Sequence, residues 1–135
     1  MKTHGYHEVD HTADIALRVW AEDFLALLRQ AAKGLYALMG AEPRPGSSEQ
    51  LVFTIPSGNQ ETVLVDFLNE LLFLAEDNGI ILDQFSFEEG YENIEVESTG
   101  KRLLSQERVI KAVTFHDLCV EKMATGYQVT ITFDV

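Results

Sequence analysis

The stretch IALRV, residues 15–19, decides how the fold begins, because its larger apolar side chains stand at every second position. Ile15, Leu17 and Val19 share one side of the stretch, which is the period of two expected of a strand with one buried face. Asp14 comes immediately before the stretch and falls on the opposite face. We therefore predict a strand here, with Asp14 outside the core.

An amphipathic helix is predicted directly after this strand. Apolar residues recur at intervals of three and four from Phe24 to Met39, a spacing typical of a helix with one face in the core. Asp23 is a good N-cap for this helix, and Gly40 supplies a stop. The helix is therefore expected to lie between these two residues.

A second helix is predicted after a short strand at residues 51–55, which Pro56 closes. Ser57 and Gln60 have the spacing of a capping box that would open the helix, and Asn78-Gly79 would end it. The apolar stripe of this helix comprises Leu64, Phe67, Leu68, Leu71, Leu72 and Ala75.

The rest of the chain is predicted to be β-structure, because it is rich in β-branched and aromatic residues. We expect strands at residues 80–87, 92–97, 109–120 and 128–135, with turns at Gly90, Gly100 and Gly126. Two helices within a mostly antiparallel set of strands predict an α+β fold, with both amphipathic helices packed on one face of the sheet. Residues 1–135 are expected to form a single domain.

The composition is strongly acidic, which bears on the partners that the protein can bind. With 135 residues and 46% hydrophobic residues, the chain can build one core. It carries 22 Asp and Glu against 10 Lys and Arg, for a formal net charge of -12. This is the wrong sign for neutralising phosphates, so we expect no tight, direct binding of nucleic acid. A basic protein surface and bound cations both remain open as partners.

The single cysteine, Cys119, excludes an intramolecular disulfide and a cysteine zinc cage. No stretch has the length of a signal peptide's apolar region or approaches the roughly 20 apolar residues of a membrane span. The sequence therefore predicts a cytoplasmic protein without a membrane partner.

The sequence HEVDH at residues 7–11 matches the zinc-protease pattern H-E-x-x-H. That chemistry needs a helix that puts both histidines on one face. Here the segment follows Gly5, carries Val9 at its centre and runs into a strand pattern, so we interpret the match as accidental. The expected structure is a solvated N-terminal arm with its histidines near a sheet edge.

The alternation of side chains in the last predicted strand points to a candidate pair of carboxylates. Val129, Ile131, Phe133 and Val135 point one way, so Asp134 points the other. If the first and last strands are neighbours, Asp14 and Asp134 could converge, and a cation would relieve their repulsion. The carboxylate expected at Val135 would add a third oxygen donor, and oxygen ligands favour a hard cation such as Ca²⁺ or Mg²⁺. The alternative is two ordinary solvated aspartates.

The segment KAVTFH, residues 111–116, places Lys111 on a face otherwise formed by Val109, Val113 and Phe115. Lys111 or His116 could contact an anion or a carboxylate beside the acidic site. The alternative is an edge-strand lysine that discourages strand addition, with a surface histidine. No nucleophile elbow, P-loop or dinucleotide-binding pattern is found in the sequence.

Four stretches together resemble the archease family: HTAD at residues 11–14, DFLNELL at 66–72, KAVTFH at 111–116 and FDV at 133–135. The similarity runs nearly end to end and keeps the order of the motifs. The resemblance implies a small α+β, non-enzymatic cofactor of the GTP-dependent RNA-splicing ligase, which joins RNA ends in tRNA splicing and RNA repair. Archeases promote the guanylylation and multiple turnover of that ligase.

The resemblance also implies a metal site at Asp14, Asp134 and Val135, with His11, Lys111 and His116 as neighbours. The metal is usually assigned as Ca²⁺, and Mg²⁺, Mn²⁺ and Zn²⁺ remain open. Two other functions stay open from the sequence. One is a metal-dependent hydrolase that acts alone, and the other is a chaperone-like binding module with a structural ion.

Overall fold

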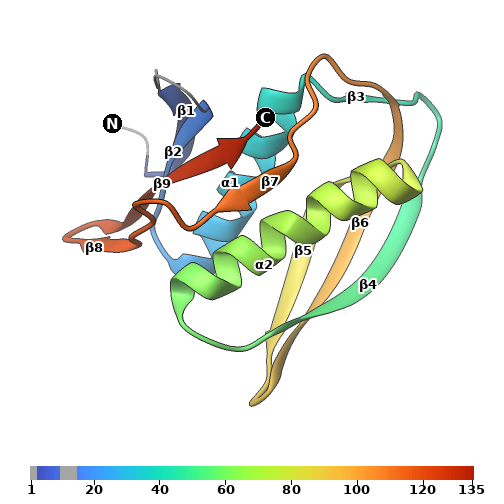
Figure 1. Ribbon diagram of the computed structural model, residues 1–135. Helices are drawn as coiled ribbons and strands as arrows, with labels where there is room; N and C mark the ends of the chain where they lie inside the picture. The colour runs from blue at the N-terminus through green and yellow to red at the C-terminus, as the bar shows by residue number, and fades with distance from the viewer. Residues whose placement is uncertain (1–2, 10–14) are drawn as a thin grey trace.

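A computed structural model describes residues 3–9 and 15–135 of the chain. Two helices lie among antiparallel strands (Figure 1), which confirms the predicted α+β class. In chain order the elements are β1 (Gly5–Val9), β2 (Ile15–Ala21), α1 (Phe24–Met39), β3 (Glu42–Pro43), β4 (Glu49–Pro56), α2 (Gln60–Phe73), the π-helical turn η1 (Leu74–Asn78), β5 (Ile80–Glu89), β6 (Asn93–Ser105), β7 (Ala112–Thr114), β8 (Glu121–Met123) and β9 (Gly126–Asp134).

The first sheet joins the two ends of the described chain. Its strand order is β1-β2-β9-β7, and β8 also pairs with β9. The pairing of β2 with β9 is antiparallel and sets Ile15 opposite Phe133. The first and last predicted strands are therefore neighbours, which is the condition set for the carboxylate pair, and the apolar faces of both strands enter the core.

The second sheet is built around the long strand β6. Strands β3, β4 and β5 all pair antiparallel with β6. Gly100 lies inside β6, so the turn predicted there was wrong. A Cβ atom at Gly100 would collide with the backbone of Ile81 and Leu82. The glycine therefore serves a close approach of two strands rather than a change of direction.

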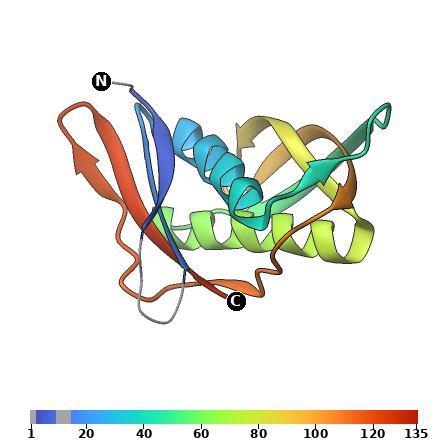
Figure 2. The ribbon, with the colours of Figure 1, turned by 90° about the horizontal axis from the view of Figure 1, so that it is seen from above.

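The helices lie between the two sheets, as the view from above shows (Figure 2). Helix α1 contacts β2 of the first sheet and β5 of the second, and α2 contacts β7 and β4. The pattern of apolar residues predicted the helix faces but not the division into two sheets. Buried side chains from all these elements form one continuous core.

The first helix has the ends that were predicted. The Asp23 carboxylate accepts a hydrogen bond from the backbone N–H of Ala26 at 2.8 Å, and Gly40 ends the helix with φ of 60°. The capping box predicted for α2 was wrong. Asn59 is the N-cap and accepts from Thr62 N at 2.8 Å, whereas the Ser57 hydroxyl donates to the carbonyl of Gly90.

Two further regions differ from the prediction. Residues 5–9 form β1 at the edge of the first sheet rather than a solvated arm. The strand expected at residues 109–120 is confined to β7, and Asp117 adopts a left-handed φ of 51° that ends any extended run. In the described part of the chain, no helix is long and apolar enough to cross a membrane.

Candidate functional site

Asp134 lies at the end of β9, where the chain leaves the core. Phe133 is fully buried, whereas Asp134 is exposed, as the alternation of side chains predicted. The backbone around Asp134 is fixed by the neighbouring strand β7, because Lys111 N–H donates to the Asp134 carbonyl at 2.8 Å. This bond uses the main-chain oxygen and leaves the carboxylate directed away from the core. Val135 follows and is 43% exposed.

The other half of the predicted carboxylate pair adjoins β2 in sequence. Ile15, the first residue of β2, stands opposite Phe133, the residue before Asp134. Asp14 and His11 lie outside the described residues. Their convergence with Asp134 therefore stays a prediction, and what the structure contributes is the adjacency of the two strands.

The segment before β7 departs from the predicted alternation. Val109 and Phe115 are 59% and 56% exposed, while Val113 and Ile110 are buried. The apolar face proposed for residues 109–115 was therefore wrong, because only residues 112–114 are extended and paired with β9. Lys111 is exposed and does not interrupt an apolar stripe.

Lys111 and His116 lie at opposite ends of β7. Ala112 pairs with Asp134 and Thr114 pairs with Thr132, so the chain runs away from Asp134 as it approaches His116. The exposed His116 ring instead contacts the Asp117 carboxylate, with Nε2 and Oδ2 3.2 Å apart. Of these two residues, only Lys111 is brought to the end of β9.

Two polar residues of α2 fix this region, and the sequence analysis did not single them out. The Asn69 side chain accepts a hydrogen bond from Val113 N–H at 3.0 Å, and Glu61 accepts from Val120 N–H at 2.8 Å. These bonds satisfy backbone donors that no strand partner reaches. The sequence offers no clear signal for Asn69, because Asp66 and Glu70 are polar neighbours on the same helix.

The zinc-protease pattern does not form its required helix. His7 and Glu8 lie in β1, where His7 pairs with Arg18 of β2. The His7 ring packs 5.5 Å from the Trp20 ring, centroid to centroid. His7 is thus near a sheet edge, as expected, and the interpretation of the motif as accidental agrees with the strand geometry of its described half.

The donor chemistry at the end of β9 fits a hard cation. Asp134 and Val135 offer only oxygen atoms, which Ca²⁺ and Mg²⁺ prefer. Within residues 3–9 and 15–135, no group of three or more His, Cys, Asp or Glu residues could hold a metal. The described ligands therefore need Asp14, or waters, to complete a coordination sphere.

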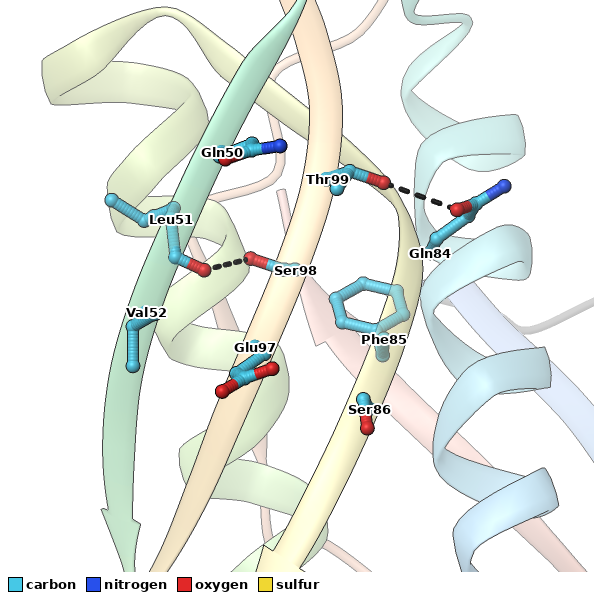
Figure 3. A pocket seen from close by; sticks show the side chains of 9 residues that line it. All are labelled: Gln50, Leu51, Val52, Gln84, Phe85, Ser86, Glu97, Ser98 and Thr99. Carbon is cyan, nitrogen blue, oxygen red and sulfur yellow. Dashed lines mark hydrogen bonds between the residues drawn. The ribbon is translucent and has the colours of Figure 1, made fainter.

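A separate hollow of about 440 Å³ lies along β4, β6 and β5 of the second sheet (Figure 3). Three of its six polar side chains bond one another or the backbone of the sheet. The Thr99 hydroxyl reaches Gln84 at 3.3 Å, and the Ser98 hydroxyl donates to the Leu51 carbonyl at 2.7 Å. Glu97 is the single ionisable residue in its lining, so the hollow does not resemble a catalytic or metal site.

Comparison with known proteins defines the class of this small α+β protein. The archease protein family matches over residues 6–135. The chain therefore belongs to the archease family.

Relatives and solved structures agree with that assignment. Protein archease of Methanosarcina mazei is 30% identical, with 96% of this chain and 95% of the relative covered. Protein archease of Methanopyrus kandleri is also 30% identical, over 87% and 89%. A crystal structure of a Thermotoga maritima archease, described as a possible chaperone, is 25% identical with a TM-score of 0.74 and covers 94% of both chains. The solution structure of Methanobacterium thermoautotrophicum protein 1598, 22% identical with a TM-score of 0.72, covers 97% and 99% and shares the fold.

Proposed function

We propose that this protein is a non-enzymatic activator of the GTP-dependent RNA-splicing ligase, acting through a carboxylate metal site at Asp14, Asp134 and Val135. Membership of the archease family carries the proposal. The exposed Asp134 supports it, because a carboxylate at the end of a strand rigidly paired on both sides is available to an ion. Bound Ca²⁺ would be held by these oxygen donors and would supply positive charge at an acidic surface.

The charge of the protein supports a protein partner rather than RNA itself. A net charge of -12 disfavours association with a polyanion. Opposite potentials speed encounter between proteins, so an acidic activator suits a ligase with a basic, metal-loaded active site. The ligase would then bring the RNA contacts, and the activator would position or deliver a metal ion.

The deciding experiment is multiple-turnover RNA ligation with limiting ligase. Wild type is expected to raise the yield, whereas Asp14→Ala and Asp134→Ala should each abolish the stimulation and keep a native circular dichroism spectrum. Asp77→Ala is the matched control, because Asp77 is an exposed aspartate of η1, away from β2 and β9. Full stimulation by folded Asp14→Ala would refute the metal-site mechanism.

A chain extended beyond Val135 sharpens the test at the third proposed ligand. A peptide bond in place of a carboxylate removes one anionic oxygen donor, so the extended form should lose stimulation while it remains folded. Calcium binding measured by calorimetry should weaken in the same variants. Unchanged calcium affinity together with unchanged stimulation would leave Asp134 as an ordinary surface carboxylate.

Two assays of the protein without ligase separate the competing functions. Fluorescence anisotropy with labelled RNA at physiological salt should show weak binding or none. Turnover of peptide or phosphoester substrates would favour the hydrolase. Suppression of the aggregation of an unrelated unfolding protein would favour the chaperone-like function, which corresponds to the description of the Thermotoga maritima structure.

A further inference from the structure

A cleft of about 330 Å³ lies away from the proposed metal site, between the edge strand β1 of the first sheet and the edge strand β5 of the second. Its wall on one side is the Tyr6 side chain, and its floor is α1 with Lys33 and Tyr36. The lining also includes Lys101, Leu82 and Asp83. Ligand sites in proteins begin at about 300 Å³, so the cleft can hold a small molecule.

Two cationic side chains line this cleft although the protein is strongly acidic. Lys33 and Lys101 are two of only 10 Lys and Arg residues in the chain. Within the described residues, neither lysine forms an ion pair, and the Lys101 ammonium makes one hydrogen bond, to the Ser47 carbonyl at 3.4 Å. Each ammonium group carries three donors, so most of this hydrogen-bonding capacity is open to an anion.

Tyr36 adds a hydroxyl donor to the floor of the cleft. Its oxygen accepts a hydrogen bond from Leu82 N–H at 3.1 Å, and the described residues offer its proton no acceptor. Burial, and then the nearby Asp83 carboxylate, raise the pKa of Tyr36. The hydroxyl therefore keeps its proton at neutral pH and can donate it to a ligand.

A β-bulge shapes the opposite wall. The pairing of β5 with β6 shifts between Leu82 and Gln84, which leaves Asp83 as the extra residue at the cleft. Bulges re-aim a side chain and are frequent beside functional sites. The bulge depends on Gly100 of β6, where a Cβ atom would collide with the β5 backbone.

A glycine in α1 shapes the wall formed by Tyr6. Gly34 is buried in the middle of the helix, where glycine costs about 1 kcal/mol relative to alanine. A Cβ atom there would collide with Leu17 and approach the Tyr6 ring to 3.1 Å. The glycine therefore lets β1 pack closely on α1 and holds the Tyr6 ring at the mouth of the cleft.

The geometry points to a binding site for a nucleoside 5′-phosphate in this cleft. The two ammonium groups match the phosphate. The exposed Tyr6 side chain offers a ring on which a base can stack. The Asp83 carboxylate can accept from an exocyclic amino group of the base. A ligand with only one of these features would leave the other groups of the cleft unused.

The probe is adenosine 5′-monophosphate, with adenosine and inorganic phosphate as its two halves. Titration of the ¹⁵N-labelled protein followed by NMR should give saturable shift changes at Lys33, Tyr36, Asp83 and Lys101, and each half should bind more weakly than the whole. Phosphate binding as tightly as the nucleotide, shift changes confined to another surface, or no saturable change would overturn the proposal.

Charge-matched variants test the two lysines. Lys33→Ala/Lys101→Ala should weaken nucleotide binding by at least about tenfold, since two charge-assisted bonds are lost. Lys122→Ala removes the same charge from β8, outside the cleft, and should change the affinity by less than about twofold. Equal affinity of the double variant and the control would refute the site.

Two single variants keep the test decisive if the double variant fails to fold. Lys33 occupies an exposed position of α1, and alanine is the best helix former, so Lys33→Ala should fold. It should still weaken nucleotide binding severalfold. Tyr36→Phe removes only the hydroxyl and should also weaken binding. Neither readout involves the ligase, so this site can fail while the proposed ligase function stands, and the reverse also holds.

Discussion

The second sheet and the short segment around β7 of the first sheet are held in place by different kinds of interaction. In the second sheet, β5 and β6 run for 10 and 13 residues, and phenylalanine rings of β4 and β5 pack around Phe67 of α2. In the first sheet, β7 has only 3 residues, and the segment around it is fixed by polar side chains of α2. Extended apolar packing builds a scaffold, whereas side-chain hydrogen bonds place a short segment beside Asp134.

This difference predicts two kinds of mutational response. Loss of apolar volume beneath the second sheet should lower the free energy of unfolding of the whole domain, because the core is continuous. Loss of a polar anchor beside β7 should open a local segment first, because β7 is only 3 residues long and is flanked by the exposed Lys111 and Phe115.

The largest effect is expected for Phe67→Ala. Phe67 is fully buried, and its ring centroid lies 5.2 Å from Phe85, 5.6 Å from Phe87 and 6.5 Å from Phe53. Removal of such a ring leaves a cavity, so the free energy of unfolding should fall by about 3–5 kcal/mol. Urea denaturation followed by circular dichroism measures the change.

Phe115→Ala is the matched control for that substitution. Phe115 is 56% exposed on the segment after β7, so its removal should change the free energy of unfolding by no more than about 0.5 kcal/mol. Similar losses for both variants would contradict the division between a scaffold sheet and a locally anchored segment around β7.

An intermediate effect is expected for Asn69→Ala. The substitution leaves the buried Val113 without its hydrogen-bond acceptor, at a cost of about 1–3 kcal/mol. Amide hydrogen exchange should accelerate at Val113 and its neighbours in β7 while β6 stays protected. Glu70→Ala is the control, since the described structure gives its side chain no hydrogen bond; equal acceleration in both variants would argue against the anchor.

Much of the fold could be predicted because it follows from periodicity. The spacing of apolar residues gave β2 and both helices, and Asp23 and Gly40 gave the ends of α1. The division of the strands into two sheets could not be predicted, because a helix buried between sheets has the same stripe as one packed on a single sheet. Gly100 illustrates the same limit, since a glycine in a turn and a glycine at a close strand contact look alike in sequence.

The candidate site could be predicted only in part, for related reasons. Alternation placed Asp134 outside the core, whereas the pairing of β2 with β9 entered only as a condition, because alternation does not say which strands are neighbours. Asn69 and Glu61 escaped prediction because their partners are backbone groups 44 and 59 residues away. The cleft beside Lys33 escaped it because its lining comes from both sheets and α1.

A smaller effect is expected at the free edge of β5, where Tyr36 binds Leu82 N–H. Tyr36→Phe loses this acceptor and should lower the free energy of unfolding by about 1 kcal/mol at pH 7. The raised pKa of Tyr36 adds a pH dependence. The unfolded chain loses the tyrosine proton near pH 10 while the folded protein keeps it, so stability should fall as pH rises above about 10.

A comparison of wild type with Tyr36→Phe isolates the contribution of Tyr36 to the pH dependence of stability. Below pH 10 the protonation of Tyr36 is the same in both states, so wild type should show no change in stability from this group. Above pH 10 the stability of Tyr36→Phe should decline less steeply than that of wild type. Parallel curves in urea titrations at pH 8 to 11 would show that Tyr36 is not held in its protonated form by burial.

The smallest effect is expected on the outer face of the second sheet, where Glu88 stands directly opposite Glu95. Like charges across a strand pair repel, so Glu88→Gln should raise the free energy of unfolding by a few tenths of a kcal/mol, within the range of about 0.2–1 kcal/mol for such pairs. Neutralising any carboxylate relieves part of the net charge of -12, so the pairwise contribution needs a double-mutant cycle with Glu95→Gln. The cycle should give a coupling that shrinks as salt is raised, because both side chains are exposed. A coupling of zero at low salt would mean that the repulsion between Glu88 and Glu95 costs the scaffold sheet no stability.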